Sequence, residues 1–317
     1  MDNIFSPSPD GPVIVVGGAG VDLIGRLDGD LRVGTSNPAR IRTSFGGSAR
    51  NVAENLARLG SKVTLLTAVG EDQNGQQLLK QVQDAGVDIS HVLVTDKHPT
   101  GSYLGVIDSN GILQFALDDI NATKTITPEY IRSLSDQFSQ ASLVVIDANL
   151  PNKTMRTIFS QARKTKIPVC ADPTSTHLAE RLRPFLNKLY FITPNQAEAS
   201  ALCDRVFENS HPEEALDAAK CLVGFGVEIA LITLAEFGVV YATSETSGHI
   251  PAARTQIVDP TGAGDALNAT VIHSLLNNIP LDDAIRLGVT AASLTLRYPG
   301  TVVKDLSLEM LYDQLII

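Results

Sequence analysis

The chain contains no tryptophan and only three cysteines, at positions 170, 203 and 221. These cysteines form no Cys-x-x-Cys pair and have no spacing typical of metal ligands, which argues against a disulfide scaffold and a zinc site. The first apolar run, residues 13–16, is too short for a signal-peptide core or a membrane span. We therefore expect a cytoplasmic protein that does not associate with membranes.

Positive charge is also scarce, because 25 Lys and Arg stand against 35 Asp and Glu, for a net charge of −10. A nucleic-acid-binding surface needs a basic face, so we expect no nucleic-acid partner. An anionic substrate would have to be attracted locally, by a helix end, a cationic side chain or a metal. With 317 residues and 44% hydrophobic residues, the chain can bury a sizeable core.

Several phosphate-binding motifs are missing. The chain has no Gly-Lys dipeptide, so it has no Walker A loop. The dinucleotide fingerprint also fails, since Leu23 occupies the third glycine position after Gly18 and Gly20. Protein-kinase signatures and the His-Glu-x-x-His motif are absent, and the six histidines are scattered. Phosphate chemistry would need a different kind of site.

Short Val- and Ile-rich runs alternate with longer helical patterns. The predicted strands span 13–16, 63–66, 143–146, 168–171, 190–192 and 229–232. The predicted helices span 49–59, 73–85, 128–138, 153–164, 196–202 and 212–225. Continuous apolar strands that alternate with helices predict an α/β fold with a parallel sheet and right-handed crossovers. Ligands of such sheets bind at the carboxyl ends of the strands.

Two stretches, about 22–45 and 100–120, instead show short alternating β patterns. Within the second, residues 102–107 and 112–117 are joined by residues 108–111 and predict a β-hairpin. We interpret both stretches as a small sheet that projects from the main domain. It would serve as a lid over the strand ends, as an oligomer edge, or as both.

Two glycine-rich segments begin helices, at residues 46–53 and 259–265. The second reads Asp-Pro-Thr-Gly-Ala-Gly-Asp and precedes a helix predicted over 266–276. The amides of Gly262, Ala263 and Gly264 would then lie at a helix N-terminus, where an anion is favoured. Asp265 beside them would either cap the helix or take a proton from a nucleophile that attacks the anion.

Three motifs resemble those of the ribokinase-like (PfkB) family of carbohydrate kinases. They are Gly46-Gly47 leading into residues 51–60, the 259–265 run, and Asn195-x-x-Glu198. The resemblance covers nearly the whole chain and implies one domain, 1–317, with three α/β/α layers, a mostly parallel sheet and a small β-sheet lid. It also implies an ATP-dependent kinase.

The resemblance further implies roles for individual residues. Asp265 would be the general base and residues 262–264 the anion hole. The resemblance implies that Glu198 holds Mg²⁺ through water. It implies that Asn195, Thr233 and Gly238 contact the nucleotide. It also implies that Asp259 and Thr261 bind a monovalent cation such as K⁺. Structural roles stay open for Glu198 as a first-turn acid, Asn195 as a helix cap and Thr233 as an ordinary strand residue.

The acceptor side is implied in the same way. Asp22, at the end of the first strand region, would bridge two sugar hydroxyls, and the other matching positions are Gly46, Gly47, Asn51 and Asn149. Many relatives carry Asn at the position of Gly20. Ribokinases carry Lys at the position of Ser48 and Glu at that of Asn149, so the chain departs from free-ribose kinases.

Within the family the chain is more similar to pseudouridine kinases, through residues 35–41, 46–55, 102–104, 119–121 and 147–150. That subgroup has a Lys shortly after the turn at 172–175, whereas this chain continues Thr-His-Leu to Leu178. The leading hypothesis is an ATP-dependent kinase of the 5′-hydroxyl of pseudouridine. Alternatives are another kinase of the family, acting on ribose, adenosine, inosine or 2-keto-3-deoxygluconate, and a non-catalytic sugar- or nucleotide-binding regulator. A regulator is disfavoured because Asp265 and the glycine turn are intact.

We expect a homodimer through the lid.

Overall fold

A computed structural model describes residues 10–110, 112–207, 211–253 and 255–315, and its largest sheet has eight strands. The order across this sheet is β14 (Ser247–Ile250), β13 (Val239–Ala242), β12 (Ile229–Thr233), β11 (Phe191–Ile192), β10 (Val169–Asp172), β9 (Leu143–Asp147), β1 (Val13–Val16) and β4 (Val63–Leu66). The six strands from β12 to β4 are parallel, and β13 and β14 add an antiparallel edge. The predicted, mostly parallel sheet is confirmed.

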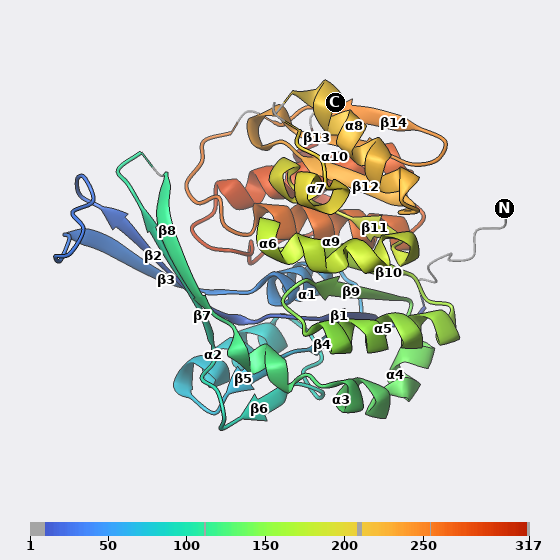
Figure 1. Ribbon diagram of the computed structural model, residues 1–317, viewed down its shortest axis with the longest axis horizontal. Coiled ribbons are helices and arrows are strands. Elements are labelled where there is room, and N and C mark those ends of the chain that lie inside the picture. Colours follow the sequence, from blue (N-terminus) through green and yellow to red (C-terminus); the bar gives the residue numbers. More distant parts are fainter. Residues whose placement is uncertain (1–9, 111, 208–210, 254, 316–317) are drawn as a thin grey trace.

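Helices cover both faces of this sheet and make a three-layer α/β/α arrangement (Figure 1). One layer holds α1 (Ser48–Arg58), α2 (Gln73–Asp84), α9 (Ala263–Leu276) and α10 (Leu281–Leu296). The other holds α3 (Pro128–Ser133), α4 (Ser135–Gln140), α5 (Asn152–Thr165), α6 (Thr176–Ala179), α7 (Gln196–Cys203) and α8 (Pro212–Gly224). Strand residues pack alternately into the two cores, Val13 and Val15 into one and Ile14 and Val16 into the other. This burial on both faces explains the continuous apolar runs.

Helix α9 lies in the core and therefore holds its own N-terminus firmly in place. All nine residues from Ala266 to Ser274 are buried, including the polar Asn268, Thr270, His273 and Ser274. The helix begins at Ala263, three residues before the predicted start, because Gly262 adopts a left-handed conformation (φ 83°) and acts as its N-cap.

A separate four-stranded sheet forms the projecting lid at the left of Figure 1. Its order is β3 (Ala39–Gly46), β2 (Gly20–Leu27), β7 (Gly101–Ile107) and β8 (Leu113–Asp119). Each of the two predicted lid stretches supplies two of these four strands, β2 and β3 from the first and β7 and β8 from the second. The predicted connection at 108–111 includes Gly111, which lies outside the described residues.

Other elements differ from the prediction or were not predicted. The single helix expected over 128–138 is two short helices, because Leu134 leaves helical geometry (φ −98°, ψ 21°). Strands β13 and β14, the two-stranded sheet of β5 (Ala68–Gly70) and β6 (Leu93–Thr95), and helices α10 and α11 (Leu308–Asp313) were not predicted. Within the described ranges, no helix combines the length and apolar character that spanning a bilayer requires.

Candidate active site

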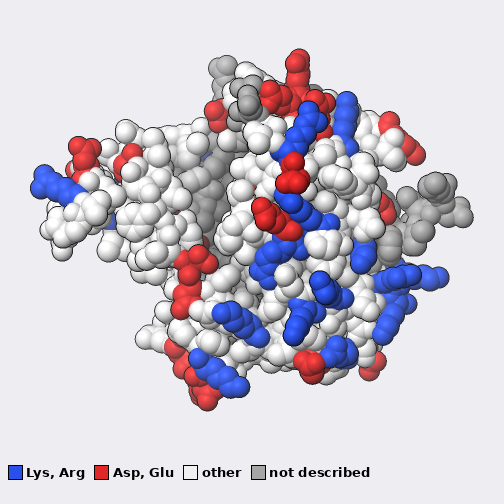
Figure 2. All heavy atoms as spheres, viewed as in Figure 1, with Lys and Arg blue, Asp and Glu red and all other residues white. Residues whose placement is uncertain are grey.

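A cavity of about 1320 Å³ lies between the lid and the carboxyl ends of the main-sheet strands. Figure 2 shows the lid standing apart from the main body with a hollow between them. The lid contributes Asp22, Tyr103 and Asp118, the loop after β9 contributes Asn149, and Asp265 comes from the first turn of α9. The cavity is therefore at the edge of the sheet where ligands were expected.

The first turn of α9 has backbone donors without helical partners beside this cavity. Thr261 and Asp265 line the cavity, whereas Gly262, Ala263 and Gly264 are not among its lining residues. The first α-helical hydrogen bond is donated by the amide of Ala266 to the carbonyl of Gly262, at 2.9 Å. The amides of Ala263, Gly264 and Asp265 precede it, and that of Ala263 reaches the carbonyl of Pro260 only at 3.5 Å. Free amides at the positive end of a helix form a site for an anionic group.

Gly262 is the residue that makes this turn possible. A Cβ atom at this position would lie 2.1 Å from the carbonyl oxygen of Thr301, and the left-handed backbone also disfavours a side chain. The turn is thus backed directly by the segment around Thr301.

The other glycine-rich helix start has a different character. At the beginning of α1, the amide of Ala49 donates to Asp147 Oδ2 at 3.3 Å, and the amide of Arg50 donates to the carbonyl of Gly18 at 3.3 Å. Gly47, the N-cap, has a φ of 93°, and a Cβ there would lie 2.5 Å from the same Gly18 carbonyl. Since these α1 amides already have protein partners, the start of α9 is the better anion site.

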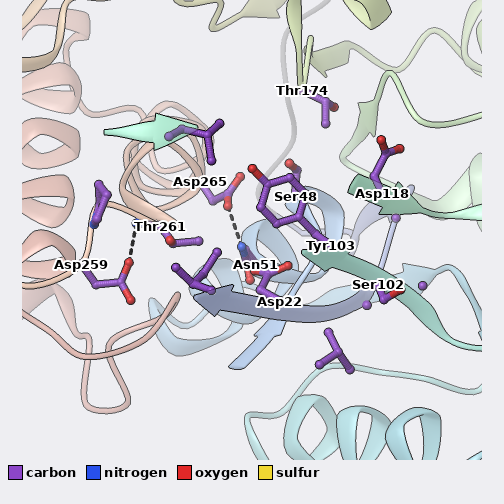
Figure 3. A pocket seen from close by; sticks show the side chains of 18 of the residues that line it. Asp22, Ser48, Asn51, Ser102, Tyr103, Asp118, Thr174, Asp259, Thr261 and Asp265 are labelled. Atoms are coloured by element: carbon purple, nitrogen blue, oxygen red, sulfur yellow. Dashed lines mark hydrogen bonds between the residues drawn. The ribbon is translucent and has the colours of Figure 1, made fainter. Parts of the chain in front are cut away.

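Asp265 lies beside the free amides and has a perturbed carboxyl group. Asn51 Nδ2 donates to Asp265 Oδ2 at 2.7 Å, the contact drawn as a dashed line in Figure 3. Burial raises the pKa of Asp265 to about 7, against the lowering effects of the Asn51 hydrogen bond and the charge of Arg50. A carboxyl group that titrates near neutral pH can both accept and release a proton.

Asp22 faces the same cavity from the lid. It is the third residue of strand β2, so the expectation that it ends the first strand region was wrong: β1 already stops at Val16. Burial raises the pKa of Asp22 to about 6, although the positive charge of Arg50 opposes this. A Cβ at Gly46 would lie 2.1 Å from the Asp22 carboxylate, so only glycine fits there.

The other predicted acceptor residues lie in the same cavity. Gly47 and Asn51 line it from the start of α1, and Asn149 lines it from the loop after β9, where its amide donates to Asp147 Oδ1 at 3.0 Å. The fold therefore brings together four of the five predicted acceptor residues, and the fifth, Gly46, lies directly against Asp22.

The predicted nucleotide residues lie farther along the sheet edge and do not line the described part of the cavity. Asn195 and Glu198 form a reciprocal capping box at the start of α7, with both bonds at 2.9 Å. Asn195 is also bridged to Thr233 at the end of β12. Gly238 closes the following turn with a φ of 89°, and a Cβ there would lie 2.1 Å from the carbonyl of Ile250. The cap is a structural role that leaves Glu198 Oε1 for another ligand.

Asp172, which the sequence analysis did not single out, lies between these two groups of residues. Its pKa is raised well above its usual range by burial first and then by the negative charges of Asp265 and Glu198. A buried carboxyl group that feels two further negative charges is the kind of environment that a divalent cation would relieve. In the described part of the chain, however, no three potential ligands are close enough to form a ready-made metal site.

The predicted cation residues Asp259 and Thr261 contact each other, since the Thr261 amide donates to Asp259 Oδ1 at 3.0 Å. The second oxygen, Oδ2, accepts from Arg42 Nη1 of lid strand β3 at 2.8 Å. The Arg42 guanidinium thus already supplies a positive charge at this carboxylate.

Sequence reasoning missed several charged residues around the site, namely Arg42, Arg50, Asp147 and Asp172. Some of them had a signal. Asp147 and Asp172 each end a buried parallel strand, where ligand-binding residues are expected. Arg42 had none, because its partner Asp259 is 217 residues away in the sequence, and the contact of Arg50 with Thr301 is equally remote, at 251 residues.

Comparison with known proteins shows what the chain resembles as a whole. The sequence model of the pfkB family carbohydrate kinases matches residues 12–306. Pseudouridine kinase of Escherichia coli is 31% identical over 93% of this chain and 94% of its own length. Guanosine-inosine kinase of Exiguobacterium acetylicum is 29% identical over 89% of this chain and 93% of its own length. Arabidopsis thaliana ribokinase, solved with ribose and ATP, shares the fold with a TM-score of 0.85 at 22% identity, over 97% of this chain and 99% of its own.

Proposed function

The chain belongs to the pfkB family of carbohydrate kinases, and from this premise we propose that it transfers a phosphoryl group from ATP to the 5′-hydroxyl of pseudouridine. Enzymes of this family are phosphotransferases with a hydroxyl acceptor. One observation carries the proposal: a carboxyl group with a pKa of about 7 lines the acceptor cavity from the first turn of a helix whose leading amides have no helical partner.

In this proposal, the hydroxyl oxygen of the acceptor forms a bond to the γ-phosphorus of ATP while Asp265 accepts the hydroxyl proton. The bond from the γ-phosphorus to the bridging oxygen breaks, and ADP leaves. The turn at 262–264 and the neighbouring amide of Asp265 stabilise negative charge on the transferred group. General-base assistance typically contributes about 10²- to 10⁴-fold in rate.

The acceptor would be held by the lid and the start of α1. The buried carboxylate of Asp22 can bridge two neighbouring sugar hydroxyls, while Gly46 and Gly47 let the backbone approach closely. Asn51 and Asn149 also line the cavity and add side-chain amide groups. Because the lid also forms one wall of the cavity, its closure would exclude water that competes for the phosphoryl group.

The nucleotide would lie beside Asn195, Thr233 and Gly238. Glu198, with Asp172 near it, fits the needs of Mg²⁺, which prefers carboxylate and water oxygens. When bound, Mg²⁺ neutralises phosphate charge. A monovalent cation at Asp259 and Thr261 would have to compete with the guanidinium of Arg42, which already binds that carboxylate.

Pseudouridine is the leading acceptor because of the resemblance to pseudouridine kinases in the lid and around Asn149. Another nucleoside or sugar kinase of the family is the second candidate, favoured by the departures at Gly20 and Leu178. His177 and Leu178 line the cavity where the subgroup carries its lysine, so recognition of the base would differ there.

An ADP-release screen with ATP and Mg²⁺ tests the proposal. The acceptors are pseudouridine, uridine, cytidine, adenosine, inosine, ribose, 2-keto-3-deoxygluconate and fructose 6-phosphate. We expect the highest kcat/KM with pseudouridine. A higher value with another acceptor would reassign the substrate within the family, and acceptor-independent ADP release alone would contradict the kinase proposal.

We also propose a homodimer formed through the lid, a cytoplasmic location and a small-molecule acceptor rather than nucleic acid. The cysteines at 170, 203 and 221 are all free, which suits a reducing compartment. The net charge of −10 disfavours a polyanionic partner. The dimer is supported by apolar side chains on the outer face of the lid, described in the Discussion.

A further inference from the structure

We propose that Arg50 is a positioning residue that fixes the root of the lid against the phosphoryl-binding turn of α9. Arg50 is wholly buried, yet it carries a positive charge and is not one of the predicted site residues. The inference rests on the proposed function only in that the lid root and the turn are taken to hold acceptor and phosphoryl group.

The guanidinium of Arg50 uses each of its nitrogens. Nη1 donates to Glu54 Oε2 at 2.8 Å, and Nε donates to the carbonyl of Gly46 at 3.3 Å. Nη2 donates to the carbonyl of Phe45 and to Thr301 Oγ1, the latter at 2.9 Å. Thr301 Oγ1 in turn donates to the Phe45 carbonyl at 2.8 Å, which closes a small network.

These partners belong to two separate parts of the site, namely lid strand β3 and the segment around Thr301. Phe45 and Gly46 are the last two residues of lid strand β3, and Gly46 packs directly against the Asp22 carboxylate. The carbonyl oxygen of Thr301 lies directly against Gly262, the residue that shapes the anion-binding turn. From α1, the helix that also carries Asn51, this one side chain therefore ties the lid strand to the segment behind that turn.

A purely stabilising role on α1 would not require this arrangement. Glu54 already accepts hydrogen bonds from Arg58 Nη2 at 2.7 Å and from Gln81 Nε2 at 3.1 Å. The additional contacts of Arg50 go to the lid strand and to Thr301. Lysine cannot replace them, because an ammonium group lacks the planar fork that reaches Glu54 and Thr301 at the same time.

Electrostatics supports the geometry. The charge of Arg50 lowers the pKa of both Asp22 and Asp265, opposing the effect of their burial. Asp147 also faces Asp265 and raises its pKa. Arg50 therefore favours the ionised forms of both acceptor-facing carboxylates while it holds the backbone that surrounds them.

The test uses Arg50→Lys and Thr301→Val, with Arg58→Lys as the matched control on the same helix. The control alters a partner of the same Glu54 but leaves the contacts to β3 and Thr301 intact. Thr301→Val removes one hydroxyl without leaving a buried charge unpaired, so it preserves the test if Arg50→Lys fails to fold. Steady-state kinetics measure kcat and KM for the acceptor and for ATP separately. Hydrogen exchange of the unliganded protein measures the exchange rates of the β3 amides.

We expect Arg50→Lys and Thr301→Val to lower acceptor kcat/KM by about tenfold, the scale of a small misplacement of reacting groups. The KM for ATP should stay within about twofold, since uniform nucleotide binding is untouched. Both variants should also speed exchange of residues 39–46, whereas Arg58→Lys should change none of these readouts. Wild-type acceptor kinetics and unchanged β3 exchange in Thr301→Val would overturn the proposal. If the wild-type protein phosphorylates no acceptor, the proposed function fails, and the exchange measurement still decides the role of Arg50.

Discussion

At the scale of single residues, the account depends on carboxyl groups whose surroundings differ. Asp265 and Asp22 are both raised in pKa by burial, to about 7 and about 6, but only Asp265 adjoins free helix amides. A base is needed where the hydroxyl meets the phosphoryl group, whereas a hydroxyl-binding carboxylate is needed at the sugar. The structure supplies one carboxyl group suited to each task.

Replacement of Asp265 by Asn keeps the shape of the side chain but removes its ability to accept the proton. We expect kcat to fall by about 10²-fold or more, with little change in acceptor affinity. Steady-state kinetics of Asp265→Asn beside Asp283→Asn, an exposed acid on α10, measures this. Turnover near the wild-type value in Asp265→Asn would exclude it as the base.

The pKa of Asp265 also predicts the pH dependence. Below a pH of about 7 the carboxyl group is protonated and cannot accept the hydroxyl proton, so acceptor kcat/KM should rise with pH through this region and then level off. Asp22, with a pKa of about 6, faces the same cavity and contributes to the acid limb. A flat profile between about pH 5 and 8 would contradict this assignment.

In the proposed function Asp22 holds the acceptor, so its loss should affect mainly acceptor binding. We expect Asp22→Ala to raise the acceptor KM by at least about tenfold with a smaller effect on kcat, because the contact is shared by ground and transition states. Asp28→Ala, at an exposed position on the same lid, is the control. An unchanged acceptor KM would show that Asp22 does not hold the acceptor.

At the scale of elements, the two glycine-rich helix starts differ in whether their first backbone amides have partners within the protein. The amides of Ala49 and Arg50 at the start of α1 are taken by Asp147 and Gly18, which ties that helix to the end of β1. The start of α9 keeps its amides open, because Gly262 makes a left-handed turn against Thr301. The difference lies in neighbours that are distant in sequence.

The turn at α9 can be tested by its stability. Gly262→Ala should lower the free energy of unfolding by about 1–3 kcal/mol, because its backbone is left-handed and Thr301 blocks a Cβ. Gly264→Ala should not destabilise, since a Cβ there meets nothing within 4 Å and alanine favours the helix by about 0.5–1 kcal/mol. Urea unfolding of both variants measures this, and equal stabilities would refute the strained turn.

The sequence predicted the buried parallel strands well, because strands covered on both faces leave long apolar runs. It did not predict edge strand β14, since β14 is largely exposed and reads Ser-Gly-His-Ile, without a long apolar run. Strand β13 was also missed, although it is buried and reads Val-Val-Tyr-Ala. Sequence reasoning placed Asp22 at the end of the first strand region and at the start of the lid stretch, whereas Asp22 is the third residue of lid strand β2, after a break at residues 17–19. The contacts of Arg42 with Asp259 and of Arg50 with Thr301 could not be predicted, since these partners come from the other end of the chain.

At the scale of the whole molecule, the lid presents two unlike faces. Asp22 and Tyr103 stand opposite each other on the cavity side. On the alternate residues, Leu104 is paired with Leu117, and Val106 with Phe115, on the outer face. Leu104, Phe115 and Leu117 are 39%, 43% and 63% exposed, so this face would gain from being covered by a second lid.

The dimer proposal therefore predicts that charge on this outer face separates the subunits. We expect the double variant Phe115→Lys and Leu117→Lys to elute as a monomer in size-exclusion chromatography with light scattering, at concentrations where the wild-type protein is a dimer. Val206→Lys, which alters a side chain that is 77% exposed on another part of the chain, should leave the dimer intact. A wild-type protein that is already monomeric at about 100 μM would exclude the dimer.

The most direct test of the account is a crystal structure with an acceptor nucleoside and a non-hydrolysable ATP analogue. We predict the acceptor hydroxyl within about 2.6–3.2 Å of an Asp265 carboxylate oxygen. The γ-phosphate oxygens should accept hydrogen bonds from the amides that open the first turn of α9. An acceptor bound in the cavity while Asp265 points away from its hydroxyl, in a pair with another side chain, would contradict the account.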